Sequence, residues 1–524
     1  MKKVSLILGM ALCACTAAFA QTQLTQFNPY AYGVEPQVKG TKVAIKYQLN
    51  SPADSTKIVI YRDNVEVGTQ PVAENTVGLH AVNFDLASLF TEAGTYTFGV
   101  RVYGTSVSEP TQVMVANGTD TTALNYAFYH PKGVAVDNNP FSPNFGRLLT
   151  NECMASTPDA GYHSSTGKQG IYAFDPTFQP IPNGNSYVFK GGNAFGNDYA
   201  PYRIRISEDG RIFVSDNCIS DGTTLWELSA DLQTWTPIFQ GTFDTVGVMN
   251  TAEGEYMTTA NSGLDVIGSG DELQILMLGF NIPGLVAYSG NGFFVDRYNL
   301  GSATSWTGVP SQHDTLSALC GSQVVPLGDN CGIAADGEGG FWFKSARGNV
   351  CAQRGFCHVN AEGVVDWELH ATPEDTAAYN ILPNGSNGGA GITRVGDLLF
   401  VGMGRKLSGC GRMQVFEIGA DATGAPELTV KYDMHIKEIS TALNDFAVDY
   451  ANNLYVVGNS NEKLLPVVLP YSGVVETPVN AELVKEATAI ENIEEAPVVN
   501  KIFRNGQVII VKDGVEYNVI GTKL

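Results

Sequence analysis

Short runs in which apolar and polar residues alternate recur along most of the chain, and a period of two residues predicts β-strands. The clearest example is residues 202–217, YRIRISEDGRIFVSDN, where two such runs flank the turn Glu208-Asp209-Gly210. An Asp-Gly pair between alternating runs is typical of a β-hairpin. Six similar phrases begin at Gly133, Gly247, Leu285, Gly332, Gly391 and Phe446. Seven variations of one hairpin predict a repeat architecture.

The hairpin phrases begin about 40 to 70 residues apart, which leaves room for one four-stranded sheet each. Such a sheet cannot bury both faces alone, so stacking around an axis is favoured. The form apolar-x-apolar-Asp-x-x-Gly-x-apolar-apolar-Val resembles the NHL-type β-propeller repeat. This resemblance implies a propeller over residues 119–472 with seven blades or, alternatively, six. The segment 124–130 can supply a strand that closes the ring.

Residues 21–118 predict a small β-sandwich. Apolar residues alternate with other residues over 43–49 and again over 96–102. Five or more short strands in fewer than a hundred residues are typical of an immunoglobulin-like (Ig-like) fold. The segments FNPYAYGVE, KVAIKYQLN and AGTYTFGVRVYG resemble fibronectin-type and flagellar hook-capping-type Ig modules of exported bacterial proteins. That resemblance implies a spacer or docking module without catalytic residues.

Residues 1–20 have the three parts of a secretory signal peptide. Lys2-Lys3 precedes an apolar run, and Ala18-Phe19-Ala20 provides a small-x-small cleavage site before Gln21. We expect an exported protein at the cell surface or in the extracellular medium, with the periplasm as the alternative. A lipoprotein signal at 12–15 is the less favoured interpretation. No later run has the roughly 20 apolar residues of a membrane-spanning helix.

The last fifty residues change in composition. Residues 473–500 contain six glutamates and one lysine, which predicts an acidic linker, with a short helix as a further option. Residues 501–524 predict a strand, a turn at Lys512-Asp513-Gly514, and a second strand. Linker and hairpin together resemble the C-terminal signal of type IX secretion cargo. This resemblance implies the secretion machinery as a partner.

Composition and charge narrow the classes of partner. An apolar content of 44% with 57 glycines suits a folded protein that is rich in turns. The formal net charge of −22 repels phosphate backbones and anionic lipid, which argues against nucleic acid and membrane surfaces as partners. Seven cysteines remain after the signal peptide, and export predicts disulfides. The pairs Cys320–Cys331 and Cys351–Cys357 would close short loops.

The chain has no His-Glu-x-x-His zinc motif and no Gly-x-Ser-x-Gly nucleophile motif. Candidate residues therefore come from position: in a propeller, the residues that follow the second strand of each blade meet at one mouth of the axis. Convergent polar groups in a concave place predict a binding site, although Asp and Asn at strand ends often bond only the turn backbone. The predicted set is Asn151, Glu152, Asp216, Asn217, Asn261, Asp296, Arg297, Lys344, Arg347, Arg405 and Asn459. Trp306, in a polar loop, is the expected ligand-facing ring.

Two classes of function fit this pattern. The favoured class is a non-enzymatic exported protein that binds a glycan or a cell-surface protein and has no cofactor. The alternative is a calcium-dependent hydrolase or lyase, since propellers that resemble gluconolactonases hold calcium with Glu, Asn and Asp. The possible oxygen ligands are Glu152, Asn217, Asn261 and Asp296. Arg297, Lys344 and Arg405 at the same mouth disfavour a divalent cation.

Overall fold

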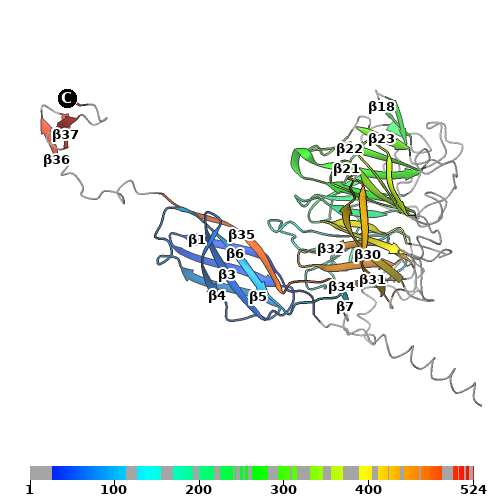
Figure 1. Ribbon diagram of the computed structural model, residues 1–524, viewed down its shortest axis with the longest axis horizontal. Helices are drawn as coiled ribbons and strands as arrows, with labels where there is room; N and C mark the ends of the chain where they lie inside the picture. Colours follow the sequence, from blue (N-terminus) through cyan, green and yellow to red (C-terminus); the bar gives the residue numbers. More distant parts are fainter. Residues whose placement is uncertain are drawn as a thin grey trace, which may run out of the picture.

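A computed structural model describes the chain as all-β, as the sequence predicts (Figure 1). The residues described are 26–113, 127–154, 169–192, 200–217, 225–239, 242–243, 248–251, 254–257, 263–280, 293–306, 310–315, 331–345, 356–369, 389–403, 411–422, 424–436, 439, 442–458, 462–486, 500–504, 507–512, 515–517 and 523–524. Within these ranges, no helix is long and apolar enough to cross a membrane.

Two antiparallel sheets face one another near the N-terminus and form a sandwich. One sheet has the order β1 (Ala31–Lys39), β2 (Lys42–Leu49), β5 (Gly78–Asp85). The other has the order β35 (Val474–Lys485), β6 (Gly94–Tyr103), β3 (Ser55–Arg62), β4 (Val65–Pro71). Ile45, Ile58 and Tyr96 are fully buried between the sheets, because alternate residues of each strand point inward. This is the alternation that the sequence shows.

The predicted acidic linker is wrong in its first part, because residues 474–485 form strand β35. This strand pairs with β6 from Val474 opposite Tyr103 to Lys485 opposite Gly94. Thr477 and Val479 are buried in it, whereas Glu482 is exposed. Charges at outward positions do not prevent a strand, so the acidic composition was a misleading signal. The propeller is therefore inserted between strands β6 and β35 of the sandwich.

Among its described residues, the middle of the chain forms six larger antiparallel sheets and one smaller sheet. The first two are β9 (Val134–Val136), β10 (Leu148–Glu152), β11 (Gly170–Phe174), β12 (Val188–Phe189), and β13 (Arg203–Ile206), β14 (Ile212–Ser215), β15 (Leu225–Leu228), β16 (Trp235–Pro237). The next two are β20 (Gly263–Ile267), β21 (Gln274–Phe280), β22 (Phe293–Asn299), β23 (Gln312–Thr315), and β24 (Cys331–Ala335), β25 (Phe341–Ser345), β26 (Phe356–Val359), β27 (Val365–Leu369). The last two are β28 (Ile392–Val395), β29 (Leu398–Met403), β30 (Gly411–Ala420), β31 (Pro426–Ile436), and β32 (Leu443–Val448), β33 (Asn453–Gly458), β34 (Glu462–Val468) with β7 (Thr111–Gln112). The smaller sheet is β17 (Thr242–Phe243), β18 (Val248–Thr251), β19 (Gly254–Met257).

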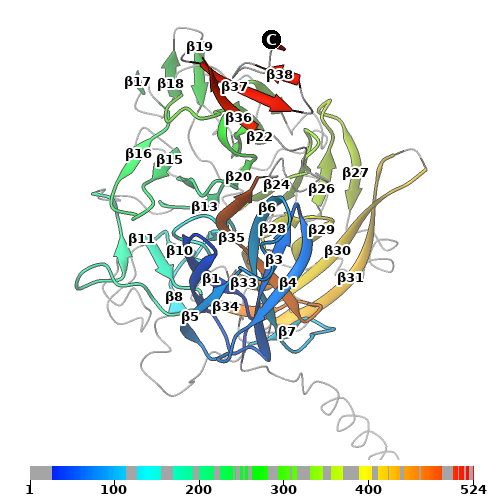
Figure 2. The ribbon, with the colours of Figure 1, turned by 90° about the vertical axis from the view of Figure 1, so that its left-hand side faces the viewer.

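The larger sheets stand around a common axis as a β-propeller (Figure 2). Their first strands contact one another in the order β9, β13, β20, β24, β28, β32, and β32 returns to β9. Hydrophobic clusters fill the spaces between successive sheets, as Leu149 and Ile204 do between the first and second. In this cycle β13 contacts β20 directly, so the small sheet β17–β19 has no place between them.

The ring closes with strands from before the first sheet. Strand β8 (Ala127–Phe128) pairs with β34, which confirms the prediction that segment 124–130 supplies a closing strand. Strand β7, which precedes β8 in the chain, also pairs with β34. Residues from both ends of the propeller thus share one sheet, and this joins its last blade to its first.

Five of the seven hairpin phrases form the first two strands of a ring sheet, as β13 and β14 do for residues 202–217. The phrase from Gly247 instead forms β18 and β19, outside the cycle. The phrase from Leu285 is also misassigned, since its described part, residues 293–297, lies in the third strand β22 (Phe293–Asn299). Both have the local hairpin pattern, but neighbouring strands decide their place in the sheet.

The C-terminal residues form their own sheet, β36 (Asn500–Arg504), β37 (Gln507–Lys512) and β38 (Val515–Tyr517). It has three strands, one more than predicted. The predicted disulfides Cys320–Cys331 and Cys351–Cys357 each include a residue outside the described ranges. They stay predictions.

Candidate functional site

Asn151 and Glu152 end β10, the second strand of the first ring sheet, and both are fully buried. Asn151 Oδ1 accepts hydrogen bonds from the backbone N–H groups of Lys132 (2.9 Å) and Gly133 (2.7 Å). Its Nδ2 donates to the carbonyls of Pro201 (2.5 Å) and Tyr202 (2.9 Å), just before the second ring sheet. This amide therefore fastens two sheets together.

Both carboxylate oxygens of Glu152 accept backbone N–H groups. Oε2 accepts from Tyr129 at 2.6 Å, and Oε1 accepts from His130 at 2.8 Å. These bonds hold the segment that follows the closing strand β8. In the parts of the chain that the structure describes, no group of three His, Cys, Asp or Glu residues is placed to hold a metal ion.

Three further predicted residues lie where the sequence places them, at or just after the end of a second strand. Asp216 and Asn217 follow β14, and Lys344 is in β25; all three are buried. Asp216 Oδ2 accepts a hydrogen bond from Trp226 Nε1 at 3.0 Å. The predicted residues Asn261, Arg347, Arg405 and Asn459 lie outside the described ranges.

The predicted position of Asp296 and Arg297 is wrong. They lie within β22, the third strand of its sheet, and not after a second strand. Arg297 donates to Gln274 Oε1 at 2.8 Å and to the carbonyl of Gly339 at 2.5 Å, in the turn of the following sheet. The apolar residues before Asp296 resemble the second strand of a hairpin, and the sequence analysis therefore placed both residues after a second strand.

Trp306, the predicted ligand-facing ring, is half-buried and packs on its neighbours. Its backbone N–H donates to the carbonyl of Ile238 at 2.7 Å, and its ring meets the edge of Tyr298 with a centroid separation of 5.8 Å. It packs on a cluster between the second and third ring sheets that includes Phe239. The polar neighbours in sequence did not reveal this contact.

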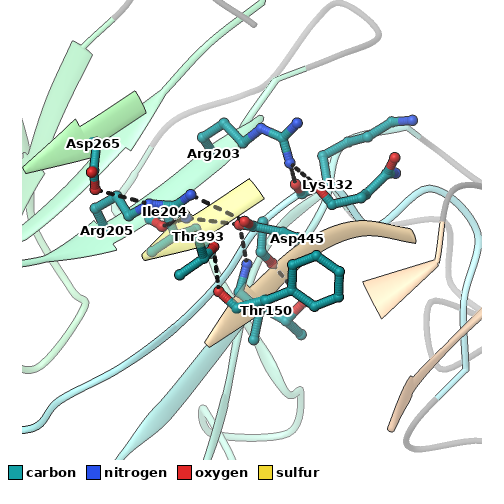
Figure 3. A network of polar contacts seen from close by, with 12 residues as sticks. Lys132, Thr150, Arg203, Ile204, Arg205, Asp265, Thr393 and Asp445 are labelled. Atoms are coloured by element: carbon teal, nitrogen blue, oxygen red, sulfur yellow. Dashed lines mark hydrogen bonds and ion pairs between the residues drawn. The ribbon is translucent and has the colours of Figure 1, made fainter. Parts of the chain in front are cut away.

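The axis itself carries a polar cluster that the sequence analysis did not select (Figure 3). Arg205 of β13 donates to both oxygens of Asp445 in β32, at 2.7 and 3.0 Å. Its Nε lies 3.5 Å from Oδ1 of Asp265 in β20. Asp445 also accepts the N–H of Val134 in β9 at 3.0 Å. First strands of four sheets thus meet through one guanidinium and its partners, which we call the axial cluster: Arg205, Asp265 and Asp445.

The electrostatics of the axial cluster follow from burial and pairing. Burial lowers the pKa of the Arg205 guanidinium, but the Asp445 carboxylate outweighs that effect and the net pKa is raised. Burial raises the pKa of Asp265, and Arg205 offsets part of the rise. Bidentate pairing of this kind fixes geometry. The cluster therefore joins first strands at the axis through one guanidinium that pairs with two carboxylates.

Arg203 strengthens the same region two positions earlier in β13. It is almost fully buried and donates to the carbonyls of Lys132 and of Asn444, the latter at 2.7 Å. The sequence carries one signal for these contacts, because polar residues stand inside the first strands RIRI and LNDFAV. Arg203 and Arg205 use these positions to reach Asn444 and Asp445 of β32.

A concave region, which we call the joint cleft, lies where the sandwich joins the propeller. It is an open cleft of about 420 Å³, lined among others by Phe27, Pro52, Asp54, Thr105 and Glu109. Two carboxylates and several hydroxyls face it, and none of the residues that the structure places around it is basic. Its electrostatic character is therefore negative.

The walls of this joint cleft are held by the contacts between sandwich and propeller. The backbone N–H of Asn28 donates to Asn453 Oδ1 at 2.8 Å, and Asn453 Nδ2 donates back to the carbonyl of Asn28 at 3.1 Å. Asn28 Nδ2 donates to the carbonyl of Ala451 at 2.8 Å. Tyr30 packs edge-on against Phe145 of the first ring sheet, with ring centroids 5.5 Å apart. The joint is thus preorganised.

Comparison with known proteins gives similarity of fold only. No protein-family model matches the chain, and no curated protein matches it. Similar solved structures include a glucose dehydrogenase (11% identity, 65% of this chain and 96% of that chain, TM-score 0.37) and the WD40 β-propeller domain of Doa1 (10%, 85% and 96%, 0.34). Another is Drosophila semaphorin 1a, extracellular domains 1–2 (8%, 86% and 88%, 0.32). These scores favour neither an enzymatic nor a binding role.

Proposed function

We propose that this is an exported, non-enzymatic binding protein whose Ig-like sandwich and six-bladed propeller act as one rigid body toward a protein partner. The observation that carries the proposal is that Glu152, a possible calcium ligand of the alternative function, is buried and hydrogen-bonded inside the protein. Glu152, which a calcium-dependent hydrolase would need as a ligand, already accepts two backbone N–H groups. The axial cluster is likewise paired with itself.

Six blades agree with the cycle of first strands and with the clusters between successive sheets. An Ig-like module agrees with the two facing sheets and their shared core. The signal peptide and the sorting-type tail support export, with the secretion machinery as a transient partner. We favour a protein partner over a glycan because the negative joint cleft suits a basic protein segment, whereas the half-buried Trp306 packs against Tyr298.

The joint cleft is the proposed binding place for that partner. Two carboxylates without a basic residue nearby suit a lysine or arginine side chain, since charge complementarity steers and fixes such contacts. Walls held by Asn28 and Asn453 require little reordering on binding. We therefore expect recognition of a basic segment.

Calorimetry with two probes tests the proposal. A short arginine-containing peptide should bind, its citrulline counterpart should not, and the double variant Asp54→Asn with Glu109→Gln should weaken binding about tenfold, or about 1.4 kcal/mol. Glu338→Gln, an exposed acid in a propeller turn, is the matched control and should bind as wild type does. Stoichiometric calcium binding that Glu152→Ala abolishes would overturn the proposal and favour the hydrolase alternative.

A further inference from the structure

The four edge strands of the sandwich differ in how they are protected. Strands β1, β4 and β35 each contain a proline: Pro36, Pro71 and Pro478. Proline has no N–H to donate and therefore discourages a further strand from pairing. Strand β5, GLHAVNFD, contains neither proline nor lysine, and among the described strands it pairs with β2 alone. One edge of the sandwich is thus open to pairing.

The groups that β5 presents at this edge follow from its register with β2. The N–H of Leu86 donates to the carbonyl of Thr41 at 2.8 Å, and Asp85 is opposite Lys42. Antiparallel ladder bonds alternate, so every second residue from Leu86 bonds to β2. The residues between them direct both backbone groups to the free edge, and these are Leu79, Ala81, Asn83 and Asp85. Leu79 is also 69% exposed.

This edge is complementary to itself. In an antiparallel pair of β5 strands centred on Val82, Ala81 and Asn83 exchange their free backbone groups, as the alternation requires. Val82 meets its own counterpart on the core side, and His80 faces Phe84. On the outer side Leu79 faces Asp85, so no like charges are opposite one another. The pairing therefore extends the backbone hydrogen bonds of the β1-β2-β5 sheet and brings the core-side residues of the two copies together.

We propose that strand β5 is a self-association surface, at which two copies of the chain join their β1-β2-β5 sheets across a two-fold axis. A two-fold contact uses the same surface on both copies, and the register centred on Val82 meets that requirement. Pairing one short strand buries less than the roughly 1,200 Å² of a stable interface. The dimer is therefore weak, and it forms at micromolar to millimolar concentration.

Sedimentation equilibrium of the mature chain over that concentration range tests the proposal. Wild type should pass from monomer to dimer. Ala81→Pro removes an edge N–H but spares the bonds to β2, and Leu79→Asp places a carboxylate opposite Asp85 of the other copy without touching the backbone. Both should remain monomeric at concentrations where wild type is dimeric, and unchanged melting temperatures would show that they fold.

The matched control is Val65→Asp in β4, a position that is 64% exposed on an edge already blocked by Pro71. This variant should dimerise as wild type does. A wild-type chain that stays monomeric throughout the range overturns the proposal. A dimer that persists unchanged in folded Ala81→Pro and Leu79→Asp overturns it as well.

Discussion

His358 lies between two carboxylates in the fourth ring sheet. Its Nδ1 is 2.6 Å from Asp366 Oδ1, and its Nε2 is 3.1 Å from Asp336 Oδ2. An ionised carboxylate only accepts hydrogen bonds, so both ring nitrogens must carry hydrogen and the ring is an imidazolium. It also lies 4.6 Å from the Trp342 ring, centroid to centroid. This one residue connects all four strands of its sheet.

The pairing makes stability depend on pH. Burial lowers the pKa of His358, but hydrogen bonds to both carboxylates outweigh it, so the folded-state pKa lies above the usual 6.5. Its contribution is therefore complete below pH 6.5 and is lost as the pH rises through the folded-state value. The pKa of Asp336 is lowered, because hydrogen bonds from His358 and from backbone N–H groups outweigh burial, so its contribution is lost as the pH falls through that lowered value.

We expect Asp366→Asn to lower the pKa of His358 and to reduce the free energy of unfolding by about 1–3 kcal/mol at pH 6, with a smaller loss at alkaline pH. Urea unfolding at several pH values measures the loss, and the NMR shift of the His358 ring measures its pKa. Glu362→Gln, exposed in a turn of the same sheet, is the control. An unchanged His358 titration would contradict the assigned imidazolium.

Glu152 gives a second prediction for a single residue. In Glu152→Gln one acceptor becomes an NH₂ group that faces a backbone N–H, either that of Tyr129 or that of His130. A buried donor then loses its acceptor, and the free energy of unfolding should fall by about 1–3 kcal/mol. Chemical denaturation checks this, with exposed Glu208→Gln as the near-neutral comparison. A wild-type midpoint would mean that Glu152 does not hold this segment.

Strand β35 decides whether the sandwich is complete. Val479 is 5% exposed and belongs to the sandwich core, whereas Val484 on the same strand is 60% exposed. We expect Val479→Asp to destabilise the protein by about 3 kcal/mol or more, because it buries an unpaired charge. Val484→Asp should change stability by less than about 0.5 kcal/mol. Equal thermal shifts for the two variants would mean that β35 does not pack on the core.

Local pattern was enough to predict most strands, because alternation and turn residues act within a few positions. The hairpin at 202–217 and the closing strand at 127–128 were found in this way. Pairing between distant segments was not predictable, so β35 was mistaken for a linker. The axial cluster was missed for the same reason, since Arg205 and Asp445 are 240 residues apart in sequence.

At the scale of the whole molecule, buried amide side chains connect the sandwich to the propeller. Asn453→Ala removes two hydrogen bonds to Asn28 and also those to Asp449. We expect a loss of about 3 kcal/mol and, in calorimetry, the separation of one unfolding transition into two. Asn452→Gly is the control, because its φ of 62° suits glycine and its side chain is exposed. A single transition in Asn453→Ala would place the coupling elsewhere, in β35 above all.

The insertion of the propeller between β6 and β35 sets the order of events during synthesis. The last sandwich strand leaves the ribosome only after the whole propeller, so β6, which pairs with β3 on one side, must wait for its second partner about 370 residues away. During that interval Phe98 and Val100 have no cover from β35. A chain that stops early therefore carries an exposed apolar strand, which marks incomplete molecules for chaperones and proteases.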